Sequence, residues 1–228
     1  MTTHVLTGAG SGIGQALARQ LADRGDHLVL LVRDEDRRAQ VAEEFTSAQV
    51  LVADLAQPGT LNGLGREVEG PVHSLVHAAG TVELAGVERL RLAQWQHHLD
   101  VNLTSPAVVT REFLPALRAA RGSVVFVNST AGLKASAGWS AYAASKFGLR
   151  GLADSLRVEE RPYGVRVTTV YPGRTATPMQ QRVHEQEERA YHPEEWMAPT
   201  TVADTIRYVL DLPRDAVTEE IVLRPGPR

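Results

Sequence analysis

The amino-acid sequence predicts an α/β fold built on a doubly wound parallel sheet, and three observations carry this prediction. Short apolar runs alternate with helical patterns along the whole chain. Most of these runs are nearly continuous in Val and Leu, which is typical of strands buried on both faces of a parallel sheet. The first run passes directly into a glycine-rich loop that opens the first helix. We therefore expect about seven strands with helices on both faces, in three α/β/α layers joined by right-handed crossovers.

The order of these patterns gives the expected elements. The helix that follows the glycine loop carries Ala16, Leu17, Leu21 and Ala22 on one stripe, as an amphipathic helix does. The other helical patterns cover longer or more polar segments. The expected strands are 4–6, 27–32, 48–53, 72–78, 122–128, 164–171 and 220–224, and the expected helices are 15–24, 35–45, 60–69, 91–120, 140–161 and 201–211.

Composition narrows the classes of function. The chain has 228 residues, which fits one domain over 1–228, and its net charge of −3 favours neither nucleic acid nor a membrane surface as a partner. It has no cysteine, which excludes disulfides, Cys-ligated zinc and thiol catalysis. No histidine pattern matches a metal site, because the adjacent His97 and His98 diverge by about 100° on a helix. With no leader-like or membrane-length apolar segment, we expect a cytoplasmic protein that acts on small molecules.

The glycine loop is the first candidate ligand site. Gly8, Gly10, Gly12 and Gly14 alternate with other residues, so the common GxGxxG pattern cannot be fitted to them. Because the loop joins a strand to a helix N-terminus, its backbone amides direct partial positive charge at whatever lies above it. A pyrophosphate suits that position, with the amides of the intervening residues Ser11 and Ile13 included. A merely tight turn is the alternative.

A second pattern bears on chemistry. Tyr142 and Lys146 are four residues apart on an expected helix, so their side chains share a face. Ser129 ends the fifth expected strand, thirteen residues before the tyrosine. A YxxxK pattern alone is common in helices, and the alternatives are a strand-capping serine and a solvated pair. Its combination with the serine and the glycine loop indicates a catalytic group.

These residue types fit proton transfer. A free tyrosine has a pKa near 10, which is poorly matched to acid–base work at neutral pH. An ammonium about 5 Å away, at an effective dielectric near 20, stabilises the phenolate by about 3 kcal/mol. We therefore expect Lys146 to lower the pKa of Tyr142. Ser129 would then hold a substrate oxygen while Tyr142 donates a proton to it.

With Gly8, Gly12 and Gly14 in the spacing TGxxxGxG, followed by the serine and YxxxK, the chain from residue 3 to about 178 resembles the short-chain dehydrogenase/reductase family. The resemblance implies a Rossmann-type fold, a nicotinamide dinucleotide cofactor, and reversible hydride transfer between it and a ketone or aldehyde and the corresponding alcohol. It also implies that Lys146 binds the nicotinamide ribose. Further cofactor contacts are implied at the family positions Asp54, Leu55, Ala79, Gly80, Pro172, Gly173, Thr175 and Thr177. For Asp54, a plain turn residue is the alternative.

The end of the second strand bears on the choice of dinucleotide. The family's NAD-binding members carry an acidic residue there, whereas this chain has Val32 followed by Arg33. Without the acid a 2′-phosphate is not repelled, and Arg33 offers it charge-assisted hydrogen bonds worth about 1.5–3 kcal/mol each. NADP(H) is therefore favoured over NAD(H). Asp34 is the competing ribose ligand, although we interpret it as the N-terminal cap of helix 35–45.

Asn102 corresponds to the family's fourth catalytic residue. Pro106 has no amide hydrogen and so leaves the Asn102 carbonyl without its helical partner. This carbonyl would hold a water that links Lys146 to solvent. The alternative is that Pro106 simply begins a helix and Asn102 caps it.

Two segments depart from the family pattern. In "HAAG", 77–80, His77 stands where the family commonly has asparagine, and we interpret it as a structural substitution. The polar segment 177–200 lies at the carboxyl ends of the strands and is expected to be a substrate lid, with a solvated surface excursion as the alternative. Leu133 and Trp139 are expected to line the substrate pocket, although Trp139 would equally suit a core.

Two other functions compete with this interpretation. One is a 3-oxoacyl-thioester reductase that receives its substrate from an acyl carrier protein, against which the acidic lid argues. The other is a non-catalytic NADP-binding sensor, against which the intact Ser129, Tyr142 and Lys146 argue. The resemblance further implies a homodimer or homotetramer assembled through the helices at 91–120 and 140–161.

Overall fold

The computed structural model describes residues 2–227, and within them seven strands form a sheet in which every neighbouring pair is parallel. The strand order is β3-β2-β1-β4-β5-β6-β7. Ligands bind such sheets where the order reverses, here outside the carboxyl ends of β1 and β4. The predicted fold class is confirmed. The strands are β1 Thr3–Thr7, β2 His27–Val32, β3 Gln49–Val52, β4 Ser74–His77, β5 Ser123–Val127, β6 Arg166–Pro172 and β7 Glu220–Leu223.

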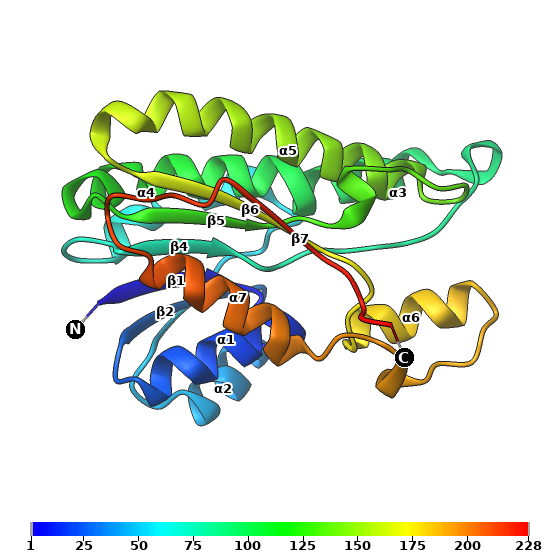
Figure 1. The fold of residues 1–228 in the computed structure, drawn as a ribbon, viewed down its shortest axis with the longest axis horizontal. Helices are drawn as coiled ribbons and strands as arrows, with labels where there is room; N and C mark the ends of the chain where they lie inside the picture. The colour runs from blue at the N-terminus through cyan, green and yellow to red at the C-terminus, as the bar shows by residue number, and fades with distance from the viewer. Residues whose placement is uncertain (1, 228) are drawn as a thin grey trace.

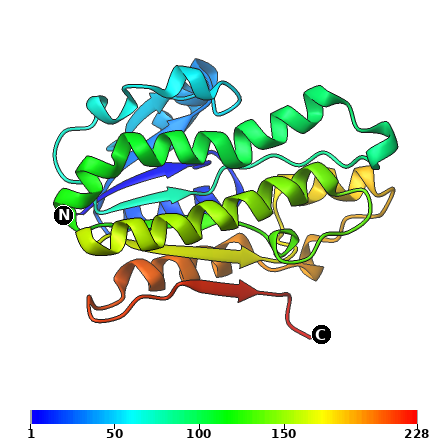
Figure 2. The same cartoon turned by 90° about the horizontal axis from the view of Figure 1, so that it is seen from above.

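Helices cover both faces of this sheet, as Figures 1 and 2 show. The helices α4 and α5 lie on one face, and α1, α2 and α7 lie on the other. Successive strand residues point to opposite faces, so Leu6 packs in the core with α1 while its neighbour Val5 packs in the core with α4. The helices are α1 Gly12–Asp23, α2 Glu35–Glu44, α3 Leu92–Leu99, α4 Ser105–Ala120, α5 Ser140–Glu160, α6 Pro178–Gln186 and α7 Pro199–Asp211.

The prediction of a helix over 60–69 is wrong. The chain makes two short 3₁₀ turns there, Pro58–Leu61 and Leu64–Glu67, separated by Gly63 with φ 88°. Gly65 explains part of the difference, because a Cβ there would lie 2.1 Å from the carbonyl oxygen of Glu112 in α4. A backbone approach this close needs glycine, which is a poor helix former.

The helix predicted over 91–120 is continuous but not uniform. A π-helical turn, Asp100–Thr104, separates α3 from α4. Pro106 lies in the first turn of α4 and has no amide hydrogen to donate to the preceding turn. Such wide turns are rare and often mark functional positions, and this one carries Asn102.

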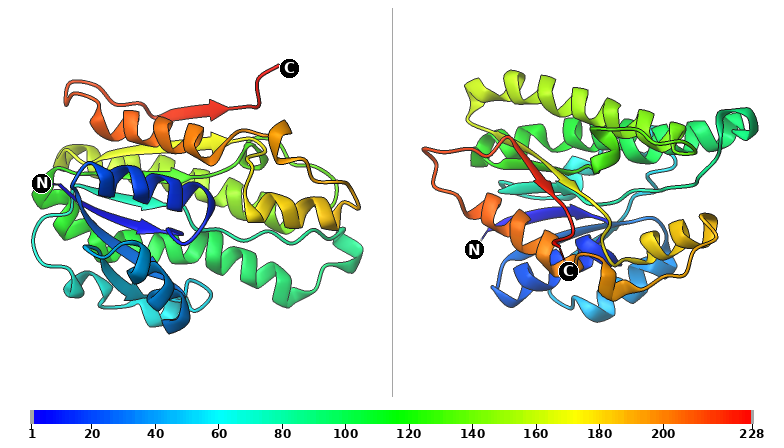
Figure 3. Two further views of the ribbon diagram at one scale, coloured as in Figure 1. Left: turned by 90° about the horizontal axis from the view of Figure 1, so that it is seen from below. Right: turned by 45° about the vertical axis from the view of Figure 1, so that its right-hand side comes forward.

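The segment after β6 lies beyond the carboxyl ends of the strands, where Figure 3 shows α6 standing away from the sheet. The sequence does not predict the helix α6. Only three of its residues are buried, Gln180, Val183 and His184, so it shows no apolar stripe. The returning chain is tied to the start of the segment by a hydrogen bond from Ala176 N to Met197 O of 2.8 Å. Within residues 2–227, no helix has both the length and the apolar character that a bilayer crossing demands.

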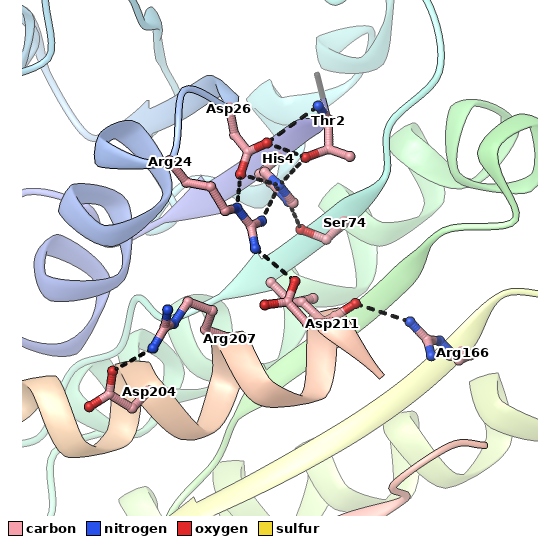
Figure 4. A network of polar contacts seen from close by, with 10 residues as sticks. Thr2, His4, Arg24, Asp26, Ser74, Arg166, Asp204, Arg207 and Asp211 are labelled. Carbon is pink, nitrogen blue, oxygen red and sulfur yellow. Dashed lines mark hydrogen bonds and ion pairs between the residues drawn. The ribbon is translucent and has the colours of Figure 1, made fainter. Parts of the chain in front are cut away.

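Opposite α6, at the amino ends of the strands, Thr2, His4, Arg24, Asp26 and Ser74 form a group that we call the amino-edge cluster (Figure 4). The two ring nitrogens of His4 contact Ser74 Oγ at 2.7 Å and Thr2 Oγ1 at 2.9 Å. Asp26 accepts hydrogen bonds from Thr2 and Arg24. Burial lowers the pKa of His4 to about 4, against the opposing influence of Asp26. Burial therefore disfavours the protonated form of His4.

Candidate active site

A cavity of about 700 Å³ opens at the carboxyl ends of the strands. Its walls come from the glycine loop after β1, the ends of β4, β5 and β6, the start of α5, and α6. A second cavity of about 300 Å³ adjoins it, at the ends of β2 and β3. Because the two cavities share lining residues, they suit a ligand with two bulky ends, one in each cavity.

The glycine loop forms the floor between the two cavities. Gly8 has φ 75° and Gly12 has φ 57°, a backbone region that side chains disfavour. A Cβ at Gly8 would lie 2.7 Å from Ala79 N, and one at Gly14 would lie 2.3 Å from Gly8 O. The loop thus packs backbone against backbone, and the N-terminus of α1 points into the space above it. The Ser11 side chain makes no capping bond to that terminus. This arrangement leaves backbone donors available to an anion.

The corner at the end of β2 lines the smaller cavity. Asp34 accepts a hydrogen bond from Arg37 N at 2.7 Å, which confirms the interpretation of Asp34 as the cap of α2. Arg33 lines this cavity and donates from Nε to Asp34 Oδ2 at 2.6 Å. Arg37 also lines it, with its Cδ 3.0 Å from where a Cβ of Gly10 would lie. Arg37 was not predicted from the sequence, because it belongs to no motif and reaches this cavity only through the way α2 lies against the sheet.

Asp54 and Leu55 follow β3 and line the same small cavity. The Asp54 carboxylate accepts hydrogen bonds from Ala56 N at 2.9 Å and from Gln57 Nε2 at 2.8 Å. It therefore shapes a turn, which was the alternative to a direct ligand contact. Both roles are compatible, because a carboxylate has acceptor sites beyond these two.

The three residues expected to carry the chemistry meet at one wall of the larger cavity. Ser129 follows β5 and caps a short turn by accepting from Ala131 N at 3.1 Å. Tyr142 and Lys146 lie on the same face of α5, with Lys146 Nζ 5.8 Å from the centre of the Tyr142 ring. Lys146 Nζ donates to Val127 O at 3.1 Å. All three line the cavity, so the structure brings together residues that the sequence separates by up to seventeen positions.

The direction of the Tyr142 pKa is opposite to the one expected. Burial raises the pKa of this phenol, and a polar contact with the Ser129 hydroxyl offsets the rise only in part. Burial also lowers the pKa of Lys146 to about 8. The expected lowering came from the attraction of the Lys146 ammonium alone, whereas the free energy of burying the phenolate dominates at this depth. Tyr142 is therefore a neutral O–H donor in the chain by itself.

Asn102 is buried behind this wall. Its Oδ1 accepts from Thr81 N at 2.9 Å, and its Nδ2 donates to Thr81 O and to Ser145 Oγ, both at 3.0 Å. The side chain thus connects the segment after β4 to α5, between Tyr142 and Lys146 in sequence. Pro106 does lie in the first turn of α4, but the N-cap residue of that helix is Thr104, so the alternative in which Asn102 caps it is wrong. The water that the Asn102 carbonyl would hold stays a prediction.

His77 ends β4 and faces away from the cavity. Its Nε2 lies 2.9 Å from Thr110 Oγ1, and its ring stacks on Phe126 with centres 4.9 Å apart. Burial lowers its pKa to about 3, with Lys146 contributing in the same direction. A neutral, packed histidine fits the structural interpretation. Ala79 and Gly80, which follow it, line both cavities.

The segment from β6 to α6 forms the opposite wall. Pro172 ends the strand and Gly173 follows it, and the Thr175 hydroxyl donates to Gly173 O at 3.1 Å. Thr177 caps α6 by accepting from Gln180 N at 3.2 Å. All four line the larger cavity. The cofactor contacts that the resemblance implied for them stay a prediction. A Cβ at Gly12 would lie 3.0 Å from Thr177 Cγ2, so the N-termini of α1 and α6 are close together.

Only one of the two residues expected in the substrate pocket lines it. Trp139 does so, and its ring lies edge-on to Tyr142 with centres 5.7 Å apart. Leu133 does not line the cavity, whereas Ala131 and Lys134 on either side of it do. The 3₁₀ turn Thr130–Gly132 explains the error, because its tight winding changes which side chains face inward.

Several polar side chains of the site were not found from the sequence. Arg174 Nη2 donates to both carboxylate oxygens of Glu187, at 2.7 and 2.8 Å, and both residues line the cavity. Lys134 and Arg182 also line it. These residues lie outside any short motif, and only the fold brings Arg174 beside Glu187, thirteen positions later.

The arrangement can position an oxygen atom and protonate it. Ser129 and Tyr142 supply two O–H donors at one wall, and Lys146 supplies an ammonium behind them. The glycine loop and the N-termini of α1 and α6 supply partial positive charge on the floor and far wall. Together these features accommodate an anionic, elongated ligand next to a small polar one.

Comparisons with known proteins agree with this geometry. Residues 2–188 match the family model described as short chain dehydrogenase. A 3-dehydrosphinganine reductase of Danio rerio is 33% identical over 187 residues, covering 76% of this chain and 56% of that protein. The chain thus spans little more than half the length of this relative.

Two solved structures share the whole fold. An alcohol dehydrogenase from the archaeon Thermococcus sibiricus, complexed with 5-hydroxy-NADP, has a TM-score of 0.88 and 26% identity, covering 100% of this chain and 99% of that one. An actinorhodin polyketide ketoreductase with NADPH has a TM-score of 0.88 and 26% identity, covering 99% and 96%.

Proposed function

The chain belongs to the short chain dehydrogenase family, and we propose that it is an NADP-dependent oxidoreductase that interconverts a ketone or aldehyde and the corresponding alcohol. One observation carries the proposal. Ser129, Tyr142 and Lys146 meet at the wall of a cavity whose floor is the glycine loop. Two of the solved structures that cover this chain almost completely hold 5-hydroxy-NADP and NADPH.

The residues present fit a dinucleotide. Gly8 and Gly14 pack too tightly for any Cβ, which leaves the backbone amides near Ser11 and Ile13 facing the ligand space. The adenosine end would lie in the smaller cavity against Asp54 and Leu55. The nicotinamide end would lie against Gly173, Thr175 and Thr177. The bound cofactor supplies or accepts the hydride.

The protein's own part is to hold the substrate oxygen and move a proton. The Ser129 hydroxyl donates a hydrogen bond to that oxygen and fixes the carbonyl carbon toward the cofactor. The neutral Tyr142 phenol donates its proton to the same oxygen during reduction. Lys146, with its positive charge, stabilises the phenolate that remains. Asn102 fixes α5 through Ser145 and so keeps Tyr142 and Lys146 in position.

Preference for NADP rests on the corner after β2. Val32 leaves no acidic side chain at the end of the strand, and Asp34 is engaged in capping α2 and pairing with Arg33. Arg33 and Arg37 both line the cavity, and a 2′-phosphate would take hydrogen bonds from their guanidinium groups.

The experiment is a titration of the purified chain with NADPH and with NADH, followed by turnover of a small panel of ketones and aldehydes. We expect tighter binding of NADPH. In Arg33→Ser/Arg37→Ser the Kd for NADPH should rise about tenfold or more, with that for NADH nearly unchanged. Equal or tighter binding of NADH by the unchanged chain would contradict the preference. Carbonyl-dependent oxidation of NADPH excludes a non-catalytic sensor, and failure on every carbonyl tested would favour it.

We further infer that the whole chain forms one unit, that 177–200 is a substrate lid, and that copies associate into a homodimer or homotetramer through the helices at 91–120 and 140–161. The support for association is that α5 exposes Phe147 and Val158, with Tyr163 just beyond its end. The support for a lid is that α6 contributes Met179 and Val183 to the cavity wall.

A further inference from the structure

One charged side chain lines the place where the two cavities meet. Five residues line both cavities, and four of them contribute the glycine loop and the segment after β4. The fifth is Arg182, which lies on the second turn of α6. It is the only charged residue common to both linings among residues 2–227. The residues that share this position with it are Gly8, Ser11, Ala79 and Gly80.

Arg182, unlike Arg174 on the same cavity wall, has no charged partner among the described residues. Its side chain is exposed and takes part in no ion pair or side-chain hydrogen bond within the described part of the chain, whereas Arg174 is paired with Glu187. On the same helix Gln181 donates to Glu185 at 3.3 Å. Arg182 is thus the unpaired cation of α6, and it faces the ligand space.

Two further sources of positive charge converge on the same place. The N-terminus of α1 opens beside Gly12, and Thr177, the cap of α6, lies 3.0 Å from where a Cβ of Gly12 would be. Helix N-termini carry partial positive charge. Two such ends and a guanidinium repel one another unless an anion lies between them, so the junction is complementary to a group of concentrated negative charge.

We propose that Arg182 is a clamp for the diphosphate of the dinucleotide, which it binds from the side opposite the glycine loop. This inference rests on the proposed function, because it requires a dinucleotide that spans both cavities. A diphosphate lies midway between the two ends of such a ligand, as Arg182 lies at the junction of the cavities. The guanidinium also matches phosphate oxygens geometrically.

The clamp couples cofactor binding to the substrate wall. Val183, the next residue, is buried in a small cluster with Tyr142 and Val82, against which Met179 and Trp139 also pack. A diphosphate held by Arg182 therefore draws α6 against the residues around Tyr142. Arg182 is therefore a positioning residue, because its contact with the cofactor fixes where the substrate-facing side of α6 lies.

The test uses the full chain and three variants. In Arg182→Gln we expect the Kd for both NADPH and NADH to rise by about tenfold or more, because both share the diphosphate. Arg182→Lys keeps the charge and should recover part of the affinity. Arg189→Gln is the matched control, since Arg189 is an exposed arginine of the same segment that lines neither cavity. Binding is followed by fluorescence titration, with the thermal midpoint and the KM of the carbonyl substrate recorded for each variant.

Each other outcome overturns the inference in a recognisable way. Unchanged affinity in Arg182→Gln removes the clamp. A loss confined to NADPH assigns Arg182 to the 2′-phosphate, and a rise confined to the KM of the carbonyl substrate assigns it to the substrate. A chain that binds neither dinucleotide before any substitution instead refutes the proposed function, which separates the two failures.

Discussion

The amino and carboxyl edges of the sheet both bury titratable groups, but only those at the carboxyl edge are available to a ligand. At the amino edge, His4 contacts Ser74 and Thr2, and Asp26 binds Thr2 and Arg24, so the cluster's polar groups satisfy one another. At the carboxyl edge, Ser129 and Tyr142 face a cavity of about 700 Å³. Buried polar groups that partner one another stabilise the fold, whereas those that face open space are available to a ligand.

The largest effect expected from this comparison concerns Tyr142. Replacing it with phenylalanine removes the O–H donor but keeps the ring that packs beside Trp139. We expect kcat for carbonyl reduction to fall by about 10²–10⁴-fold, with the Kd for NADPH nearly unchanged. Steady-state kinetics and titration measure the two quantities. If the variant keeps its kcat, the assignment of the proton donor is wrong.

The amino-edge cluster should affect the free energy of unfolding and not catalysis. Above about pH 6.5 His4 is neutral whether the chain is folded or unfolded. As the pH falls toward its folded pKa of about 4, the unfolded chain takes up a proton that the folded chain does not. The free energy of unfolding should therefore fall with the pH, by up to about 1.4 kcal/mol per pH unit for this group.

Urea unfolding at several pH values between 7 and 4.5 measures this dependence. In His4→Gln the slope against pH should be smaller than in the unchanged chain, while His77, whose pKa is also lowered, titrates in both. The kcat of His4→Gln at pH 7 should match that of the unchanged chain. Identical slopes would show that the cluster does not exclude the proton from His4.

The smallest expected effect, on kcat/KM, tests which residues line the substrate pocket. Trp139→Ala removes a cavity wall and an aromatic contact worth about 0.5–1.5 kcal/mol, so kcat/KM should fall a few-fold. Leu133→Ala, six positions earlier, should leave kcat/KM unchanged because Leu133 does not line the cavity. Equal losses in the two variants would restore Leu133 to the substrate pocket.

The fold was predictable because its determinants are local. Each strand of the sheet overlaps an apolar run, and five of the six expected helices follow amphipathic or capped patterns, such as the one that Asp34 begins. The helix at 60–69 failed because the contact of Gly65 with Glu112 in α4 is a tertiary constraint. The helix α6 was missed because little of it is buried.

The site was predictable only where a motif marks it. The residues Ser129, Tyr142 and Lys146 lie at fixed spacings from one another, and the fold places them together. The pKa of Tyr142 was not predictable, because spacing gives the distance to Lys146 but not the depth of burial. Arg37 and Arg182 belong to no motif, and their place at the cavities depends on how α2 and α6 lie against the sheet.

The wide turn at Asp100–Thr104 has a consequence for how the chain can vary. One additional residue per turn rotates everything beyond it by about 100° about the helix axis. The buried side of α4, with Phe113 and Leu117, is thereby set in phase with Asn102. Removing a residue from this turn would keep either the buried side of α4 or the Asn102 side chain in its place, but not both. The stretch from α3 through the wide turn to α4 must therefore vary as one unit.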